Sequence, residues 1–183
     1  MSKRKGMQYV IRALPKVVEK HPEVLYLIIG ETHPVVRKDE GESYRKKLYN
    51  EIKALGLKEN VKFYNRFLPI EELCSYIEAT DIYVTPYYDP QQISSGTLAY
   101  AIGAGKACIS TPYLYAKDAL RDNRGLFARF KSSNDIAGHI NRLLDFPELK
   151  KNIELNAYNY GKSWGWEDVG STYFKLLNEI AKG

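Results

Sequence analysis

Hydrophobic positions follow two patterns that alternate along the chain, one typical of helices and the other typical of buried strands. In residues 7–18 the apolar positions recur at intervals of three and four, which predicts a helix with one buried face, interrupted or kinked at Pro15. Residues 23–30 ("EVLYLIIG") form a continuous apolar run, which predicts a strand buried on both faces. Residues 41–56 return to the helical period and end at a glycine, Gly56.

The alternation continues to the end of the chain. Further strands are predicted at "VKFYNRF", "DIYVTPY", "KACIST" and "GLFARF". Further helices are predicted from Pro69, from the loop at residues 94–97, and as three successive helices in residues 134–182. Strands that alternate with helices at this spacing predict an α/β fold, a doubly wound and mostly parallel sheet of the Rossmann-like type. The sequence contains no repeat and no linker, so we expect residues 1–183 to form a single domain.

The start of the chain differs from this pattern. A doubly wound domain ordinarily begins with a strand, whereas this sequence begins just before a helix. We therefore expect the chain to be a fragment whose first strand is supplied by sequence outside residues 1–183.

Composition narrows the classes of partner. The 183 residues are 44% hydrophobic, enough to bury one core without disulfides. Cys74 and Cys108 lie far apart along the chain in apolar surroundings, which favours structural thiols in a reducing compartment. The three histidines are too scattered to predict a metal site.

The sequence has no run of about 18 apolar residues and no signal-peptide pattern, so we expect a cytoplasmic protein. A net charge of +5 favours acidic partners, but the charges are dispersed, so we expect a small phosphorylated ligand and no nucleic acid.

Ligands of open parallel sheets bind beyond the carboxyl ends of the strands. Three loops hold such positions, at residues 30–36, 65–67 and 87–96. The third loop reads "YYDPQQISSG" and leads directly into a helix that runs to about Ala104, so the exposed amides and dipole of that helix form a candidate phosphate site. Ser and Thr are also ordinary helix caps, and from this loop alone we prefer that interpretation by about two to one.

Four stretches in the same order carry a more specific signal: "RKGMQYVIRALPKVVEKHPEVLYLIIG", "LGLKENVKFYNRFLPIEELCSYIEATDIYVTPY", "LAYAIGAGKACISTPY" and "SWGWEDVGSTYFKLL". They resemble the nucleotide-sugar-dependent glycosyltransferases of the retaining family 4, formerly called group 1. The likeness covers nearly the whole chain and is to the C-terminal, donor-binding half of the GT-B fold. The sequence is more similar still to a bacterial subgroup with "THP", "Q..SGTLAYA" and "STPY" patterns.

The resemblance implies a set of substrate-binding residues. Lys5 matches a lysine that contacts the donor diphosphate, and its usual arginine partner would lie upstream of this chain. Gln92 and Tyr100 stand where the family has two glutamates that contact the transferred sugar and the ribose. The loop residues whose amides and hydroxyls would meet the phosphates are Ser94, Ser95, Gly96 and Thr97.

Other loops supply further candidates. His33 follows a buried strand in "GETHP", which favours a sugar or base contact about as well as a simple turn. Arg66 lies where the family's backbone reads the nucleobase, and it adds charge near the phosphates. Thr111 or Tyr113 could reach the ligand, or the tyrosine could simply pack.

The implied reaction moves a sugar from a nucleoside-diphosphate sugar to an acceptor hydroxyl with retention of configuration, without a metal or other cofactor. The acceptor, a glycan or lipid-linked sugar, would bind the missing N-terminal domain, so we expect residues 1–183 alone to bind the donor weakly without turnover. Polysaccharide or glycolipid synthesis is the family-level expectation and allows peripheral contact with the inner face of the membrane. The loss of both glutamate charges favours an alternative, a non-catalytic nucleotide-binding or interaction domain derived from the same fold. A third interpretation, a general phosphate- or nucleic-acid-binding module, rests on the basic pI alone.

Overall fold

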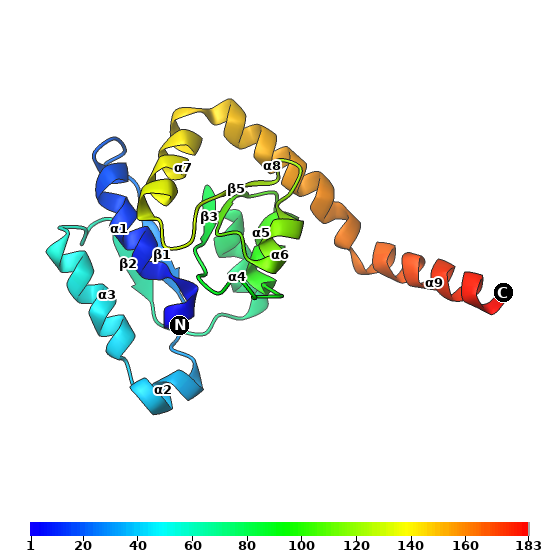
Figure 1. Ribbon diagram of the computed structural model, residues 1–183, viewed down its shortest axis with the longest axis horizontal. Helices are drawn as coiled ribbons and strands as arrows, with labels where there is room; N and C mark the ends of the chain where they lie inside the picture. The colour runs from blue at the N-terminus through cyan, green and yellow to red at the C-terminus, as the bar shows by residue number, and fades with distance from the viewer. Residues whose placement is uncertain (183) are drawn as a thin grey trace.

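The computed structural model describes residues 1–182 of the chain (Figure 1). The strands are β1 (Tyr26–Ile29), β2 (Val61–Tyr64), β3 (Ile82–Thr85), β4 (Ala107–Ser110) and β5 (Gly125–Phe127). The helices are α1 (Met7–Val18), α2 (Pro34–Glu40), α3 (Ser43–Ala54), α4 (Ile70–Glu78), α5 (Gly96–Gly103), α6 (Leu114–Ala119), α7 (Ser133–Asp145), α8 (Pro147–Gly161) and α9 (Trp166–Lys182), with short 3-10 helices η1 (Lys3–Lys5) and η2 (Lys162–Trp164).

The strands are paired in parallel throughout, which confirms the predicted α/β fold. β1 pairs with β2, with Tyr26 opposite Val61, and β3, β4 and β5 form a second group with β4 in the middle. Within residues 1–182 no ladder of hydrogen bonds joins β1 to β3, so the predicted sheet is divided into two. The burial of the strands reflects this division. β4 has a strand on each side and is buried at every position, whereas β1 and β3 each have one partner and one buried residue.

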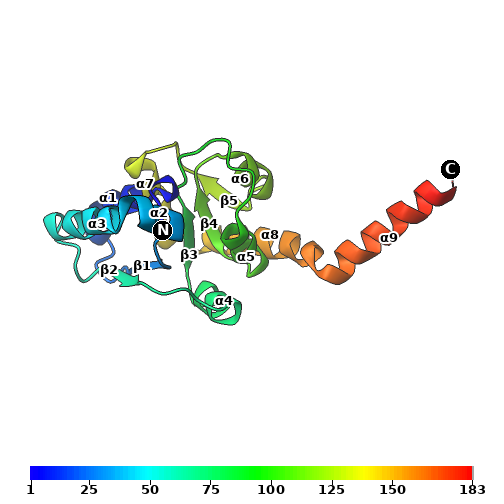
Figure 2. The same ribbon diagram turned by 90° about the horizontal axis from the view of Figure 1, so that it is seen from below.

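Helix α1 joins the two groups of strands. Its residues Val10 and Val17 pack with Ile109 of β4 and with α7, whereas Ile11 and Leu14 pack with Ile28 of β1 and with α3. Figure 2 shows α1 and α3 on one side of β1 and β2. Helices α5 and α6 cover the opposite face of β4, the face that carries Cys108. Helix α1 therefore holds η1 at a fixed place relative to β3.

Three local differences from the sequence prediction have simple causes. Helix α1 is not interrupted at Pro15, because this residue loses only one backbone hydrogen bond within a helix that is buried on both of its packed faces. Helix α2 was missed because it is seven residues long and has no buried face. Helix α6 has six residues, too few to show a helical period.

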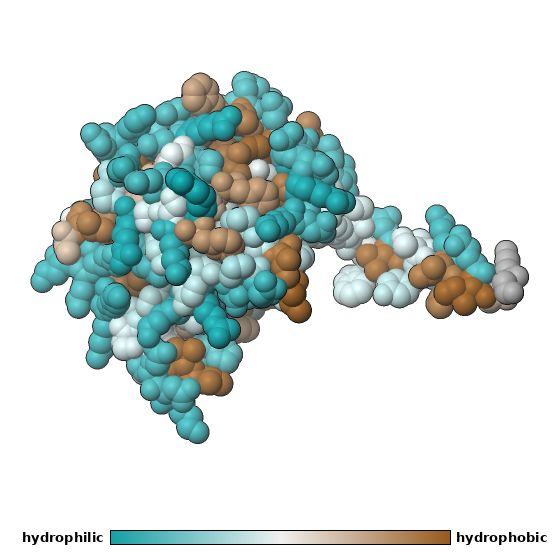
Figure 3. Space-filling model, viewed as in Figure 1, coloured by the Kyte–Doolittle hydropathy of each residue, from teal (hydrophilic) through white to brown (hydrophobic). Residues whose placement is uncertain are grey.

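Helix α9 extends away from the rest of the chain (Figures 1 and 2). Its large side chains are mostly exposed, Trp166 to 90%, and apolar atoms are visible along the arm in Figure 3. In the part of the chain that the structure describes, no helix is both long and apolar enough to cross a bilayer.

Candidate functional site

Two distant segments of the chain meet at the carboxyl end of β3. After Thr85 the chain leaves the strand through Pro86 and Tyr87 and continues as a loop to Ser95, where α5 begins. Segment η1 lies against the start of this loop, since the amide of Tyr88 donates a hydrogen bond of 3.3 Å to the carbonyl of Arg4. The loop at residues 87–96 is therefore in direct contact with the start of the chain.

Tyr87 connects Lys5 to the start of α5. The Lys5 ammonium donates a hydrogen bond of 2.7 Å to the Tyr87 hydroxyl and lies 3.9 Å from the centre of the Tyr87 ring. The same hydroxyl is 3.5 Å from Oγ of Ser95, which accepts the amide of Leu98 at 3.4 Å as the cap of α5. A positive charge is thus fixed beside the positive end of a helix dipole, an arrangement that favours an anion.

Tyr87 packs on the buried side chains of Thr85, Ser110, Thr111 and Tyr113, whose hydroxyls are hydrogen-bonded. The Tyr113 ring is fully buried and stacks on the Tyr87 ring with centres 5.1 Å apart, and its hydroxyl donates to Thr85 at 3.4 Å. Thr85 in turn donates to Ser110 at 2.9 Å, and Thr111 donates to the carbonyl of Tyr87. Burial raises the pKa of Tyr113, which therefore stays neutral. Thr111 and Tyr113 pack beneath the loop, so the expectation that either could reach the ligand is wrong.

The predicted binding residues of the loop and of α5 differ in how far they are exposed. Ser95 is buried as the cap, whereas Ser94 and Gly96 are exposed and Thr97 is half-buried. A β-carbon on Gly96 would meet no atom within 4 Å, so the space in front of the helix start is open. The side-chain amide of Gln92 donates a hydrogen bond of 2.8 Å to the carbonyl of Ser94. Tyr100, one turn into α5, is 45% exposed.

His33 and Arg66 lie on other loops. Nδ1 of His33 accepts the amide of Val35 at 3.3 Å and caps α2, and the ring is exposed. The Arg66 guanidinium makes two hydrogen bonds to the carboxylate of Glu72, which raises the pKa of Arg66. Within the described residues, no hydrogen bond links either side chain to the loop at 87–96. The structure therefore links Lys5 to Ser95 through Tyr87. The amide of His33 donates to the carbonyl of Met1 at 3.4 Å, so this loop lies against the start of the chain, whereas Arg66 is paired with Glu72.

A charged cluster fixes the loop that carries His33. Glu42 accepts hydrogen bonds from the Thr32 hydroxyl at 2.6 Å and from Arg45 at 2.9 Å. These hydrogen bonds lower the pKa of Glu42 to about 2, and the bond from the Thr32 hydroxyl contributes more than the one from Arg45. Arg45 also donates to the carbonyl of Gly30 at 3.5 Å. Glu42 and Arg45 thus neutralise each other and hold the end of β1 in place.

No metal centre is formed by the described residues, because no three His, Cys, Asp or Glu side chains come together among residues 1–182. Cys74 and Cys108 are free thiols, as the sequence predicted. Cys108 is buried against α5, and this burial raises the pKa of its thiol to about 12, so it is neutral and unreactive.

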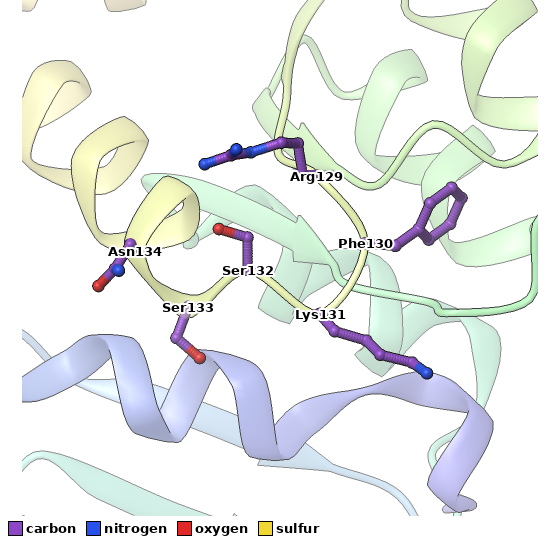
Figure 4. Close-up of a pocket in the computed structure, with 6 residues that line it drawn as sticks. All are labelled: Arg129, Phe130, Lys131, Ser132, Ser133 and Asn134. Atoms are coloured by element: carbon purple, nitrogen blue, oxygen red, sulfur yellow. The ribbon is translucent and has the colours of Figure 1, made fainter.

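Two further residues lie near Lys5 and the loop at 87–96, and their positions were not predicted from the sequence. Tyr87 was predicted only as the end of a strand and the first residue of the candidate loop, and no contact with Lys5 was predicted for it. Lys131 lies in the turn between β5 and α7, in an open pocket of about 460 Å³ lined by residues 129–134 (Figure 4). Its ammonium is 5.7 Å from the centre of the Tyr88 ring, and no pattern in the sequence predicts that approach.

Comparison with known proteins places this geometry in context. The model of the family described as glycosyl transferases group 1 matches residues 1–160. A curated relative from Geotalea daltonii is 28% identical over 164 residues, which is 84% of this chain and 39% of the relative. It is named UDP-N-acetylglucosamine–N-acetylmuramyl-(pentapeptide) pyrophosphoryl-undecaprenol N-acetylglucosamine transferase.

Solved structures share the fold. The C-terminal domain of LpcC, a glycosyl transferase group 1 family protein from Francisella tularensis, is 25% identical with a TM-score of 0.75, over 87% of this chain and 78% of that domain. HepE of Anabaena, solved in complex with UDP-glucose, is 20% identical with a TM-score of 0.82, over 100% of this chain and 47% of HepE. The chain therefore spans less than half the length of the curated relative and of HepE.

Proposed function

This chain belongs to the glycosyl transferases of group 1, and from that membership we propose that residues 1–183 are the domain that binds the donor, a nucleoside-diphosphate sugar. In the whole protein this domain presents the sugar to an acceptor hydroxyl that is held outside residues 1–183. We also propose that the sugar is transferred with retention of configuration and that the reaction requires no metal ion.

The placement of Lys5 beside the start of α5 supports the proposal most strongly. The first amides of a helix have no partner inside the helix, and Ser95 satisfies that of Leu98, which leaves the amides of Gly96 and Thr97 available to a ligand. The Lys5 ammonium uses one of its three protons on Tyr87 and keeps two. A diphosphate bound here accepts from both the ammonium and the helix amides.

This arrangement fits the chemistry of a departing nucleoside diphosphate. When the bond to the sugar breaks, negative charge accumulates on the terminal phosphate of the leaving group. Lys5 and the α5 dipole are fixed by Tyr87 and Ser95 before the reaction, so they stabilise that charge without having to reorganise. This is the task that a divalent cation would otherwise perform.

The sugar and nucleoside sides of the ligand require other residues. We assign the sugar hydroxyls to Gln92, whose amide must first leave the carbonyl of Ser94, and the ribose to the exposed Tyr100. His33 and Arg66 stand at the ends of β1 and β2, and we assign them to the outer edge of the site. We propose that the acceptor is a glycan or lipid-linked sugar and that the whole protein makes peripheral contact with the inner face of the membrane. The Geotalea relative, whose name describes an undecaprenol-linked acceptor, supports this class.

Calorimetric titration of the domain with UDP, GDP and their sugars tests donor binding. We expect saturable binding of one nucleotide class, and a loss of about tenfold or more in affinity for Lys5→Met, because a charged hydrogen bond contributes on the order of 2 kcal/mol. Lys3→Met is the matched control, since Lys3 lies in the same turn of η1 but pairs with Glu40. If no nucleotide binds, or if both variants weaken binding equally, the proposal is wrong.

A second variant tests the helix start itself. Gly96→Val leaves the fold intact, because a β-carbon there meets nothing within 4 Å, but its methyl groups fill the space in front of the amides. We expect unchanged thermal unfolding and no measurable nucleotide binding.

The second candidate function is a domain that binds a nucleotide without transferring a sugar. The neutral side chains of Gln92 and Tyr100, the first of them bonded within its own loop, favour it. Assays of the whole protein with a bound sugar nucleotide separate the two functions. Sugar transfer to an acceptor supports the transferase, whereas tight binding with neither transfer nor donor hydrolysis supports the non-catalytic domain.

A further inference from the structure

Lys131 adopts a backbone conformation that lysine rarely adopts. Its φ is +61°, and the other non-glycine residues of positive φ among residues 1–182 are Asp122 and Asn123. Asp and Asn tolerate this region because their short side chains bond locally, whereas a lysine there gains nothing to offset the crowding of its β-carbon. Glycine would adopt the same conformation without strain. Strained backbone of this kind persists where the surrounding structure imposes it.

The turn around Lys131 is held on both sides. The amide of Ser132 donates to the carbonyl of Arg129 at 3.1 Å, and the Ser132 hydroxyl caps α7 by accepting the amide of Asp135 at 3.2 Å. The carboxylate of Asp135 in turn binds the Arg129 guanidinium through two hydrogen bonds of 2.8 Å. The charge of Arg129 is therefore neutralised, and Lys131 lies at the apex of a fixed turn.

The Lys131 side chain leads toward the proposed donor site. Figure 4 shows it extending away from Arg129 and along the N-terminal segment that carries η1 and α1. Its ammonium is 5.7 Å from the centre of the Tyr88 ring. Tyr88 follows the tyrosine that holds Lys5, and its amide is bonded to Arg4. Among residues 1–181 no carboxylate lies within ion-pair distance of Lys131, whereas the nearby Asp89 is 3.9 Å from Arg4.

We propose that Lys131 is a second cation for the donor diphosphate, supplied by the β5–α7 turn beside Tyr88. This proposal rests on the proposed donor site. Lys5, Tyr88 and Lys131 come from three segments that meet beyond the carboxyl ends of the strands, and an anion at the start of α5 attracts both ammonium groups. The hydrogen bonds of Arg129, Ser132 and Asp135 impose the strained turn and so fix the place from which the Lys131 side chain extends.

The test compares Lys131→Gly, Lys131→Met and Lys131→Arg in the same domain. Lys131→Gly relieves the strain, so we expect its unfolding midpoint to rise by about 2 °C while its affinity for the nucleoside diphosphate falls about fivefold. Lys131→Met should lose the same affinity without the gain in stability, and Lys131→Arg should keep the affinity. Affinity for the corresponding nucleoside monophosphate should change less in every variant, since that ligand lacks the terminal phosphate.

Asn123→Gly is the control, because it relaxes another residue of positive φ, +59°, away from the donor site and should leave nucleotide affinity unchanged. Two failures are distinguishable. If the unmodified domain binds no nucleoside diphosphate, the proposed donor site is wrong and the role of Lys131 with it. If the domain binds and Lys5→Met weakens binding while Lys131→Gly and Lys131→Met do not, the donor site stands and Lys131 is only part of a turn.

Discussion

Gly6 lies directly against the backbone of Pro86, so that a β-carbon on Gly6 would come within 1.9 Å of the Pro86 carbonyl oxygen. Gly6 has a φ of +70° and caps both η1 and α1, and Pro86 follows the last residue of β3. This close approach is what places Lys5 over Tyr87. A glycine is required there for two reasons, the left-handed backbone and the absence of space.

Gly6→Ala should therefore be strongly destabilising. We expect a loss on the order of 3 kcal/mol in the free energy of unfolding, since the variant combines an unfavourable φ with a clash against backbone that cannot move aside. Nucleotide affinity should fall as well, because η1 and Lys5 are displaced from Tyr87. Chemical denaturation followed by circular dichroism measures the first effect.

Gly56→Ala provides the matched control for Gly6→Ala. Gly56 has the same φ of +70°, but a β-carbon there meets nothing within 4 Å. Gly56→Ala should therefore lower the free energy of unfolding by only about 1 kcal/mol, the cost of the unfavourable backbone conformation. Equal losses in the two variants would show that contact with Pro86 contributes nothing.

Much of the fold could be predicted from the sequence, because each strand is an apolar run between turn residues and each long helix has a clear period. Residues 166–182, for example, are helical as expected. The division of the strands into two groups could not be predicted, since it depends on which edges pair and not on the local pattern of β1 or β3. Short α2 and α6 have too few residues to show a period.

Some residues of the candidate site could also be predicted from a local sequence signal, whereas others depend on contacts between distant segments. Ser95 was predictable because a serine before a helix is a local signal, and the structure confirms it as the cap of α5. The role of Tyr87 depends on Lys5, which lies 82 positions away along the chain. Lys131 was missed because lysine does not mark a left-handed turn, so no local rule points to its conformation.

Tyr100→Phe tests whether the tyrosine hydroxyl contacts the nucleotide. Tyr100 is 45% exposed and its hydroxyl has no hydrogen-bond partner among the described residues, so stability should stay within about 0.5 kcal/mol. If the hydroxyl binds the ribose, the dissociation constant for the nucleotide should rise about fivefold, the contribution of one neutral hydrogen bond. Tyr158→Phe, at 46% exposure on α8, should change neither quantity. An unchanged dissociation constant for Tyr100→Phe would remove Tyr100 from the site.

Glu42 should make stability depend on acid pH. Its pKa is lowered from 4.5 to about 2 by the Thr32 hydroxyl and then by Arg45, so the folded state favours the carboxylate. The resulting stabilisation is present above pH 4.5 and is lost as the pH falls toward 2. Glu42→Gln should therefore be less stable than the unmodified domain at pH 7, with the difference shrinking between pH 4.5 and 2.

Urea denaturation at pH 7, 4.5, 3 and 2 measures the effect of Glu42→Gln. Glu59→Gln is the control, because the Glu59 side chain is 92% exposed and its one ion pair among the described residues is with Lys62, at 3.8 Å. It should show no such dependence. A difference between Glu42→Gln and the unmodified domain that stays constant with pH would mean that Thr32 and Arg45 do not stabilise the carboxylate.

Gly161 and Gly138 form a last pair of variants that separates packing from helix propensity. Gly161 ends α8 against α5, and a β-carbon there would lie 2.7 Å from the α-carbon of Gly103 and 3.0 Å from the carbonyl oxygen of Ile102. Gly138 lies within α7 with nothing inside 4 Å. Alanine favours a helix over glycine by up to about 1 kcal/mol, so Gly138→Ala should stabilise the domain. Gly161→Ala should instead destabilise it by about 2 kcal/mol, because α8 must move away from α5. Thermal and urea unfolding of both variants measure these changes, and a gain in stability for Gly161→Ala would show that the contact between the two helices is loose.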